Sequence, residues 1–213
     1  MDLASVDHVL TTTRSVRKRL DFTRPVPREV IEECIDIALQ APSGSNAQGW
    51  SFVVITDPAK KKAIADYYRK TFTAYAATPQ REYPESDPRA AQGLKVRDSA
   101  VYLAENMEKA PVLVIPCLEG RPSGGSQAGF WGSILPAAWS FMLAARSRGL
   151  GTAWTSMHLV HEQQISELLG IPANVSQAVL FPVAYFTGSD FKKADRIPAK
   201  QVTHWDSWGN HLA

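Results

Sequence analysis

Apolar residues recur at helical spacing in several stretches of the chain. Residues 27–39 carry an apolar face repeated every three to four positions, which predicts a helix that opens at Pro27 and stops before Pro42. The same spacing predicts helices over residues 59–75, 101–107 and 162–169, the last closed by Gly170. Residues 134–146 are apolar nearly all round, so we expect a central helix that is covered on most sides.

A further helix is predicted near the N-terminus. Ser5 is placed to cap it, and apolar residues follow at helical spacing from Val6 to Leu10. The threonines at positions 11–13 are β-branched and weaken a helix. Residues 14–19 are therefore expected at the end of this helix or just past it.

Four apolar stretches, rich in β-branched and aromatic residues, predict strands over residues 50–56, 112–117, 152–157 and 177–187. The helices come between them at irregular intervals. This order favours an α+β fold, with a mixed sheet sandwiched by helices, over a regular parallel-sheet fold. A chain of 213 residues fits one domain, residues 1–213.

Two regions have no apolar period. Residues 78–93 hold three prolines among charges, which predicts a mobile surface loop or lid. Residues 189–213 form a C-terminal extension without a pattern of its own, although Trp205 and Trp208 lie in it. Two tryptophans in such a segment indicate burial against a partner subunit.

Charge and cysteine content narrow the class of protein. The formal net charge is only +2 and no basic stripe is interleaved with aromatic residues, so we expect no nucleic-acid partner. Cys34 lies on an apolar helix face and Cys117 ends a strand, which favours buried thiols over a disulfide. No signal-peptide pattern and no long uninterrupted apolar run is present, so the expectation is a soluble cytoplasmic protein without a membrane partner.

A basic cluster follows the first helix. Arg14 and Arg17 are three residues apart, so on one helical turn they would share a face, and Ser15 adds a hydroxyl. Arginine holds phosphate through a planar bidentate fork. A solvated basic helix end explains the same residues, and this segment alone does not decide between the two.

A small polar loop separates the second helix from the first strand. Pro42 and Gly44 are explained by a plain turn. Ser43, Asn46 and the neighbouring Ser45 and Gln48 offer the alternating donors and acceptors that suit the pyrimidine edge of a flavin. Composition alone leaves both interpretations open.

Other polar and aromatic residues carry weaker signals. His158 and His161 flank a strand-to-helix turn, where a polar helix start is favoured over a proton donor. Phe130 and Trp131 are interpreted as packing residues in preference to a wall over a flavin. The five histidines show no metal-ligand spacing, so no metal site is predicted.

Four blocks of sequence together resemble the FMN-dependent nitroreductase family. They are Arg-Ser-Val-Arg from Arg14, Ala-Pro-Ser-Gly-Ser-Asn-Ala-Gln-Gly-Trp from Ala41, Ala-Ala-Arg-Ser-Arg-Gly-Leu-Gly-Thr from Ala144, and Arg-Ile-Pro from Arg196. Each block is modest alone, but the set keeps the family's order over most of the chain. The resemblance implies an α+β homodimer that binds one FMN in each of two sites at the dimer interface.

The resemblance also implies roles for individual residues. Arg14, with Ser15 beside it, would hold the FMN phosphate, Arg17 would lie near the pyrimidine end, and Arg196 would add a C-terminal phosphate contact. A cation near the pyrimidine would stabilise reduced flavin, which tends to be anionic there. The remaining implied contacts are a loop from the partner subunit, with Pro42, Ser43, Gly44 and Asn46, and a strand along the isoalloxazine, with Trp154, Thr155 and Ser156.

Two positions depart from the family's pattern. Gly49 stands where a proline usually precedes the tryptophan, which loosens the exit of the loop. Thr13 stands where many members carry a first arginine, which leaves fewer cations for the phosphate.

The activity implied by the resemblance is that of an FMN-dependent NAD(P)H oxidoreductase. Hydride would pass through flavin N5 to a small electron-poor acceptor such as a nitroaromatic or a quinone, and no protein residue is assigned as catalytic acid or base. A dehalogenase-like or other substrate-specific flavoenzyme of the same fold remains an alternative, since the Pro-Ser-Gly run resembles dehalogenating relatives equally well. A non-catalytic protein that binds or stores FMN is the third interpretation.

Overall fold

The computed structural model describes residues 1–79, 83–84, 87–122 and 127–211. Its longer helices are α1 (Leu3–Thr12), α2 (Arg28–Ala38), α3 (Pro58–Ala76), α4 (Pro88–Asn106), α6 (Leu135–Ser147) and α7 (Glu162–Leu169), with short helices α5 (Gln127–Trp131) and α8 (Ala199–Val202). The strands are β1 (Trp50–Ile55), β2 (Val112–Glu119), β3 (Leu150–Thr152), β4 (Val175–Gln177) and β5 (Phe181–Tyr185). Single 3-10 turns cover Gly44–Asn46, Met107–Lys109 and Met157–His161.

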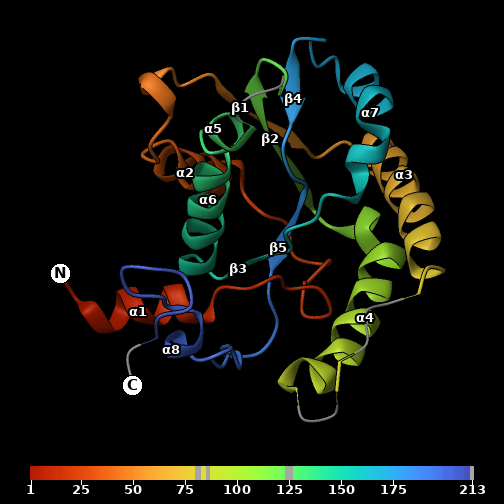
Figure 1. Ribbon diagram of the computed structural model, residues 1–213. Helices are drawn as coiled ribbons and strands as arrows, with labels where there is room; N and C mark the ends of the chain where they lie inside the picture. Colours follow the sequence, from red (N-terminus) through yellow and green to blue (C-terminus); the bar gives the residue numbers. More distant parts are fainter. Residues whose placement is uncertain (80–82, 85–86, 123–126, 212–213) are drawn as a thin grey trace.

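The sheet is built around β2. Its strands follow the order β1-β2-β5-β3, and β4 pairs with the other end of the β2 edge that β5 uses. All four strand pairs are antiparallel, and an isolated parallel bridge joins Ser15 to Thr152. Helices cover both faces of this sheet, with α2 and α6 on one side and α3, α4 and α7 on the other (Figure 1). The predicted α+β fold class is confirmed, although the sheet that was expected to be mixed is antiparallel throughout its named strands.

Strand β2 explains why one stretch of the sequence is apolar without alternation. Leu113, Ile115 and Cys117 point into the core under α3, α4 and α7, whereas Val112 and Val114 point into the core under α2 and α6. Successive residues of a strand face opposite sides, so a strand covered on both faces must be apolar at every position.

Helix α6 is the central helix that the sequence predicts. Phe141 and Met142 are fully buried against α2 and the sheet. Among the described residues, the stretch Gln127–Ser147 is the one helical run long and apolar enough to cross a membrane by length and composition, a test that a core helix also passes. Its packing against the sheet accounts for that composition.

Several boundaries differ from the sequence-based predictions. Asp2, not Ser5, caps α1 through a bond from the Ala4 N–H, because the helix begins three residues earlier than predicted. The strand predicted over residues 152–157 ends at Thr152 and continues as an isolated bridge between Thr155 and Leu180. The strand predicted over residues 177–187 is broken between β4 and β5, where the Ala178 N–H turns to Pro116 O.

Both cysteines are buried and free, as the sequence predicts. Burial raises the pKa of Cys34 to about 11 and that of Cys117 to about 12, so both remain neutral thiols at physiological pH.

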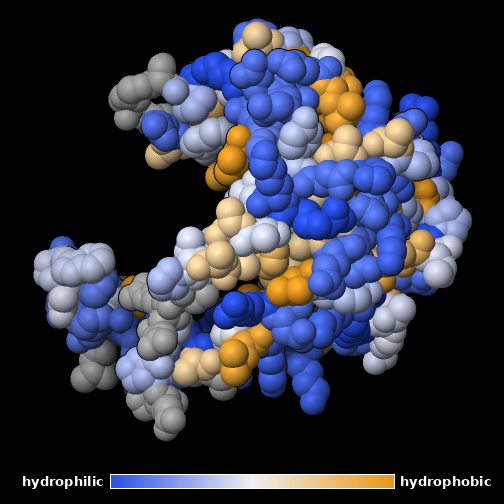
Figure 2. Space-filling view, turned by 90° about the vertical axis from the view of Figure 1, so that its right-hand side faces the viewer, coloured by the Kyte–Doolittle hydropathy of each residue, from blue (hydrophilic) through white to orange (hydrophobic). Residues whose placement is uncertain are grey.

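The face covered by α3, α4 and α7 is largely hydrophilic, with apolar side chains scattered over it (Figure 2). Exposed apolar residues occur elsewhere, on α1 and in the C-terminal tail, and they include Leu3, Leu10, Trp205 and Trp208. Both chain termini lie in the same part of the molecule (Figure 1).

Candidate active site

The basic motif after α1 is bound to the end of strand β3. The Val16 N–H donates to Thr152 O at 2.8 Å, and the Trp154 N–H donates to Ser15 Oγ at 3.1 Å. Gly151 allows this close approach, since a Cβ there would lie 2.9 Å from Leu20 and 3.0 Å from Val16. The second glycine of the Arg-Gly-Leu-Gly-Thr block therefore has a packing role: it lets the motif lie against the sheet.

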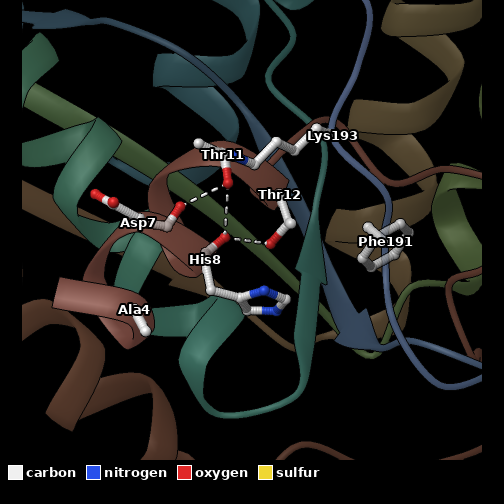
Figure 3. Close-up of a pocket in the computed structure, with 7 residues that line it drawn as sticks. All are labelled: Ala4, Asp7, His8, Thr11, Thr12, Phe191 and Lys193. Carbon is white, nitrogen blue, oxygen red and sulfur yellow. Dashed lines mark hydrogen bonds between the residues drawn. The ribbon is translucent and has the colours of Figure 1, made fainter. Parts of the chain in front are cut away.

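Arg14 and Arg17 do not share a helical face. The helix ends at Thr12, where the hydroxyl of Thr12 donates back to the carbonyl of His8 (Figure 3). Thr13 is extended and Ser15 forms a bridge to Thr152, so the two arginines do not lie one turn apart on a helix. Arg14 donates to the carbonyl of Lys192, while Arg17 approaches Ser99 Oγ at 3.4 Å.

Arg14 lies in a cluster of positive charge. Burial, followed by the positive charges of Arg196 and Arg146, lowers the pKa of Arg14. Arg146 pairs with the carboxylate of Asp190, which His8 also approaches at 3.0 Å. Arg196 is exposed, and its guanidinium bonds its neighbour's carbonyl at 3.0 Å. The cations exceed the nearby carboxylates, so the cluster suits an anion such as phosphate.

A pocket opens beside this cluster. It measures about 290 Å³ and lies between α1 and the segment after Asp190 (Figure 3). His8 and Thr12 line it from α1, and Phe191 and Lys193 line it from the C-terminal extension, residues 189–213. Buried nitrogens near this segment, Arg146 Nε and Arg19 Nη2, have no hydrogen-bond partner among the described residues. The guanidinium of Arg19 lies over the Phe191 ring at 4.1 Å and that of Arg146 over the Phe186 ring at 5.0 Å, so aromatic faces contact both groups.

The polar loop between α2 and β1 has a strained backbone that serine side chains hold in place. Ser45, Asn46 and Gln48 all have φ near +52° to +53°, a region that non-glycine residues rarely occupy. Ser43 Oγ accepts the Gln48 N–H at 3.1 Å, and Ser133 Oγ accepts the Gly44 N–H at 3.0 Å. Unusual backbone conformations held by side chains are typical of ligand-binding loops.

A second pocket of about 290 Å³ lies under this loop. Ser43, Gly49, Glu119 and Phe130 contribute to its lining. Phe130 and Trp131 pack edge to face with ring centroids 5.0 Å apart, and both belong to the apolar cluster beneath the pocket. This contact agrees with their interpretation as packing residues, while Phe130 also forms part of the pocket wall.

One chain does not bring the loop and the arginines together. The loop contacts Ser133 just before α6, whereas Arg146 at the far end of α6 donates to Thr12 Oγ1 at 3.4 Å. The 13 residues of α6 rise roughly 20 Å at 1.5 Å per residue. The two sets of predicted site residues thus lie at opposite ends of the same helix (Figure 1).

The segment after β3 joins the arginine side of the site. Trp154 is half-buried and packs edge to face on Phe181 at 5.6 Å. Thr155 is buried and exchanges two backbone bonds with Leu180, of 3.2 and 2.8 Å. Ser156 is exposed at the start of the following 3-10 turn.

Comparison with known proteins identifies the family. The model of the nitroreductase family matches residues 10–185. The chain belongs to the nitroreductase family. It is 28% identical to a putative NADH dehydrogenase/NAD(P)H nitroreductase of Methanothermobacter thermautotrophicus. The 179 aligned residues cover 83% of this chain and 74% of the relative.

Two further relatives are deiodinases. Iodotyrosine deiodinase of Danio rerio is 30% identical over 192 residues, which cover 86% of this chain and 62% of that protein. A crystal structure of oxidized iodotyrosine deiodinase, bound to FMN and 3-iodo-L-tyrosine, superposes with a TM-score of 0.67 at 20% identity. It covers 92% of this chain and 96% of that one, so the nitroreductase-family chain shares its fold.

The predicted lid is partly helical in this nitroreductase-family chain. Asp87 caps α4, which begins at Pro88, so residues 88–93 belong to a helix and not to a loop. The Asp87 side chain accepts the Arg89 N–H at 2.8 Å. The prolines of this segment favoured a loop in the sequence-based prediction, although proline is also common in the first turn of a helix. Residues 80–82 and 85–86 of the predicted lid lie outside the described part of the chain.

His158 is not part of a polar helix start. Its side chain is fully buried, and neither ring nitrogen has a hydrogen-bond partner among the described residues. Burial lowers the pKa of His158 to about 3, so the imidazole is neutral at pH 7. His161 lies nearer the surface, with its ring 4.9 Å from that of Tyr67. Across the described residues, no group of three or more metal-binding side chains is found.

Sequence reasoning missed several residues at this site. Arg146 lies inside one of the blocks that carry the family resemblance, so its position was a usable signal. Ser99, which Arg17 approaches, comes from helix α4, and no motif marks it. Ser133 has no such signal either, because its contact with Gly44 joins positions far apart in the sequence.

Proposed function

We propose that this chain is an FMN-dependent NAD(P)H oxidoreductase that acts as a homodimer in the cytoplasm. The observation that carries the proposal is the cluster of Arg14, Arg146 and Arg196, in which burial, and then the neighbouring positive charges, lower the pKa of Arg14. A cationic cluster that exceeds its nearby carboxylates fits the phosphate of a nucleotide cofactor. The crystallised deiodinase relative is bound to FMN, which supports the choice of nucleotide.

The residues on this side of the site have separate tasks in the proposal. Arg14 and Arg196 hold the phosphate. Ser15 fixes the Trp154 N–H, which aligns the segment of Trp154, Thr155 and Ser156 with the isoalloxazine. Arg17, which approaches Ser99 Oγ on α4, is assigned to the pyrimidine end of the ring.

The second half of the site comes from a partner subunit. Pro42, Ser43, Gly44 and Asn46 lie one length of α6 away from Arg14 within a chain, so a two-fold dimer is the simplest way to join them. Exposed apolar residues on α1 and in the tail, Leu3, Leu10 and Trp208 among them, are the surface that such a dimer would bury.

FMN held by these residues would supply the electron chemistry, with NAD(P)H as the hydride donor and a nitroaromatic or a quinone as the acceptor. The chain itself binds and orients, and its cations favour the reduced, anionic flavin. His158 is excluded as the proton donor at neutral pH, because it is buried and neutral. The NAD(P)H nitroreductase name of the archaeal relative supports this reaction class.

The test begins with an absorbance spectrum of the purified protein, followed by anaerobic addition of NADPH or NADH. Flavin bands that bleach on mixing are the expected result. The double variant Arg14→Ala/Arg196→Ala should purify colourless, while Arg28→Ala, on an exposed ion pair with Glu32, serves as a control for loss of charge. A wild-type protein that is colourless and fails to bind added FMN contradicts the proposal.

Reductive dehalogenation is a second candidate. The relative from Danio rerio is a deiodinase at 30% identity, and the crystallised deiodinase holds 3-iodo-L-tyrosine beside FMN. Under this alternative the start of α4 recognises an amino-acid substrate. Protection of the Asp87–Arg89 cap from hydrogen exchange by 3-iodo-L-tyrosine, with iodide release from the reduced protein, would favour it over the nitroreductase reaction.

A further inference from the structure

The last residue of β2 places a carboxylate beside the polar loop. Glu119 ends the strand, and its backbone is fixed on both sides, because its N–H donates to Gly49 O at 2.8 Å and it pairs with Val175 of β4. Its side chain is exposed and lines the pocket of about 290 Å³ under the loop, called the loop pocket below, together with Ser43 and Phe130. A charged group on a rigid element is well placed to orient a ligand.

The carboxylate of Glu119 is uncovered on the side of Gly49. A Cβ added to Gly49 would lie 3.4 Å from Glu119 Cβ and 3.9 Å from Glu119 Oε2, so any side chain at this position would stand against the carboxylate. Glycine leaves that face open. Gly49 is also one of the two positions at which the sequence departs from the family's pattern.

Among the described residues, no cation neutralises Glu119. None of those that line the loop pocket is basic, and none forms an ion pair with this carboxylate. Arg121, two positions further along, is engaged elsewhere: its Nη1 donates to Glu162 Oε1 at 2.7 Å, and its Nε donates to Ala173 O at 2.9 Å. The described lining of the loop pocket therefore carries an unbalanced negative charge.

Phe130 adds an aromatic ring to the same lining. Gly120, with φ at +101°, lets this ring approach the end of β2, since a Cβ there would lie 3.2 Å from Phe130 Cε2. The edge-to-face contact with Trp131, with ring centroids 5.0 Å apart, holds the ring in place. A carboxylate attracts cations by charge, and an aromatic face attracts them by its quadrupole. The loop pocket thus combines two groups that favour an ammonium ion.

We propose that Glu119 determines substrate specificity: the loop pocket takes the cationic end of an electron acceptor, such as a protonated amine, in preference to a neutral or anionic group. The inference rests on the proposed function, because the loop beside the pocket belongs to the half of the site that a partner subunit supplies. It adds a substrate class, aromatic acceptors that carry a protonated amine. Glu119 binds and orients such a substrate and takes no part in the electron transfer.

Two nitroaromatic probes that differ in charge test the proposal. At pH 7 para-nitrobenzylammonium carries a protonated amine, and para-nitrobenzyl alcohol is a neutral compound of nearly the same size. Both are titrated into the purified, oxidised protein by isothermal titration calorimetry, without NAD(P)H, so that no turnover occurs. We expect the wild type to bind the cation about fivefold more tightly than the alcohol, through a partly solvated ion pair and a cation–π contact.

Glu119→Gln keeps the shape of the side chain and removes its charge. It should reduce the preference for the cation to about twofold or less and leave the affinity for the alcohol unchanged. Glu29→Gln is the matched control, since Glu29 is an exposed carboxylate in the first turn of α2, at the end of that helix remote from the loop. It changes the net charge equally and should leave the preference intact. Phe130→Leu should weaken the binding of both probes, because it removes the aromatic wall.

A wild type without preference for the cation, or a Glu119→Gln variant that keeps the preference, overturns the role of Glu119. Unchanged affinities of Phe130→Leu for both probes would show that they bind outside the loop pocket, which also overturns it. These results leave the proposed function standing when the flavin bands still bleach on addition of NADPH or NADH. A wild-type protein that binds no FMN overturns the proposed function and, with it, the assignment of the cation as an electron acceptor.

Discussion

The backbone N–H of Trp154 donates to the hydroxyl of Ser15 across 139 positions of sequence, at 3.1 Å. The bond joins the segment that carries the arginines to the segment that carries Thr155. Ser15 therefore serves the architecture of the site, since its oxygen already accepts a backbone donor. The same junction depends on Gly151, whose missing side chain leaves room for Val16 and Leu20.

Gly151→Ala should disrupt this junction. The new Cβ would lie 2.9 Å from Leu20 Cδ2 and 3.0 Å from Val16 Cβ, so either the buried Leu20 side chain or the segment after α1 must shift. Overpacking of this kind costs about 1–3 kcal/mol of unfolding free energy. FMN affinity should fall with it, because Arg14 and Arg17 move as well. Urea denaturation and an FMN titration measure the two effects.

Gly93→Ala provides the control for this prediction. Gly93 lies inside α4 with nothing within 4 Å of an added Cβ, so alanine should stabilise the helix by roughly 0.5–1 kcal/mol. If both variants changed the free energy of unfolding by the same amount, the effect at Gly151 would come from backbone propensity and not from the contact with Val16.

The buried His158 should make the protein less stable in acid. Its pKa is lowered from 6.5 to about 3 by burial, so below pH 6.5 the unfolded chain binds a proton that the folded chain does not. This contribution destabilises the folded protein progressively between pH 6.5 and pH 3, and it vanishes above pH 6.5. The expected loss between pH 7 and pH 5 is about 2 kcal/mol from this residue.

His158→Leu should remove that part of the pH dependence. An imidazole whose nitrogens have no partner among the described residues can be replaced by an apolar group with little loss. Denaturation curves of wild type and variant at pH 7 and pH 5 give the contribution of His158 to the pH dependence of the free energy of unfolding. His211→Asn, at an exposed histidine near the C-terminus, is the control. An unchanged difference between the two pH values in His158→Leu would refute the assignment.

The sequence predicts those parts of the fold whose signal is local. Helix α7 and its end are predicted to the residue, because Gly170 takes the left-handed conformation, with φ at +69°, that glycine favours. Strand β2 is predicted from its uniform apolar composition. The end of β3 is not, because Thr155 is held by a bridge to Leu180 that only the folded chain creates.

The candidate site also contains residues that the sequence predicts and residues that it does not. Arg14, Ser15 and Arg17 stand together in the sequence, and a motif predicts them. The structure corrects their geometry, because the threonine-rich end of α1 gives way to an extended segment. Ser133 is marked by no motif, since its partner Gly44 comes from a distant segment of the chain. Contacts between residues far apart in sequence are what single-sequence patterns leave out.

The C-terminal tail should carry part of the dimer interface. Trp208 is 91% exposed in the single chain and Trp205 is 51% exposed. Trp205→Ser/Trp208→Ser should therefore shift the protein toward monomer in analytical ultracentrifugation, since large aromatic residues dominate interface energetics. Truncation before Asp195 should have the same effect and also lose FMN, because it removes Arg196. A dimer unaffected by either change would place the interface elsewhere.

Subunit mixing gives the sharpest test of a site shared between two chains. Arg14→Ala/Arg196→Ala removes the phosphate cations, and Ser43→Ala/Asn46→Ala removes the side chains of the loop. We expect each variant alone to bind FMN poorly. The prediction concerns what happens when the two are unfolded together, refolded and allowed to pair at random.

In a mixed dimer, one site combines the altered arginine positions with the altered loop, and the other combines the unaltered half of each chain. Random pairing of equal amounts makes about half of the dimers mixed, so about a quarter of all sites should bind FMN with wild-type affinity. If instead the loop and the arginines of the same chain formed the site, every site in a mixed dimer would carry one defect. A titration of the mixture that recovers no tight binding, while two unmixed wild-type samples treated identically do, would then show that each chain builds its site alone.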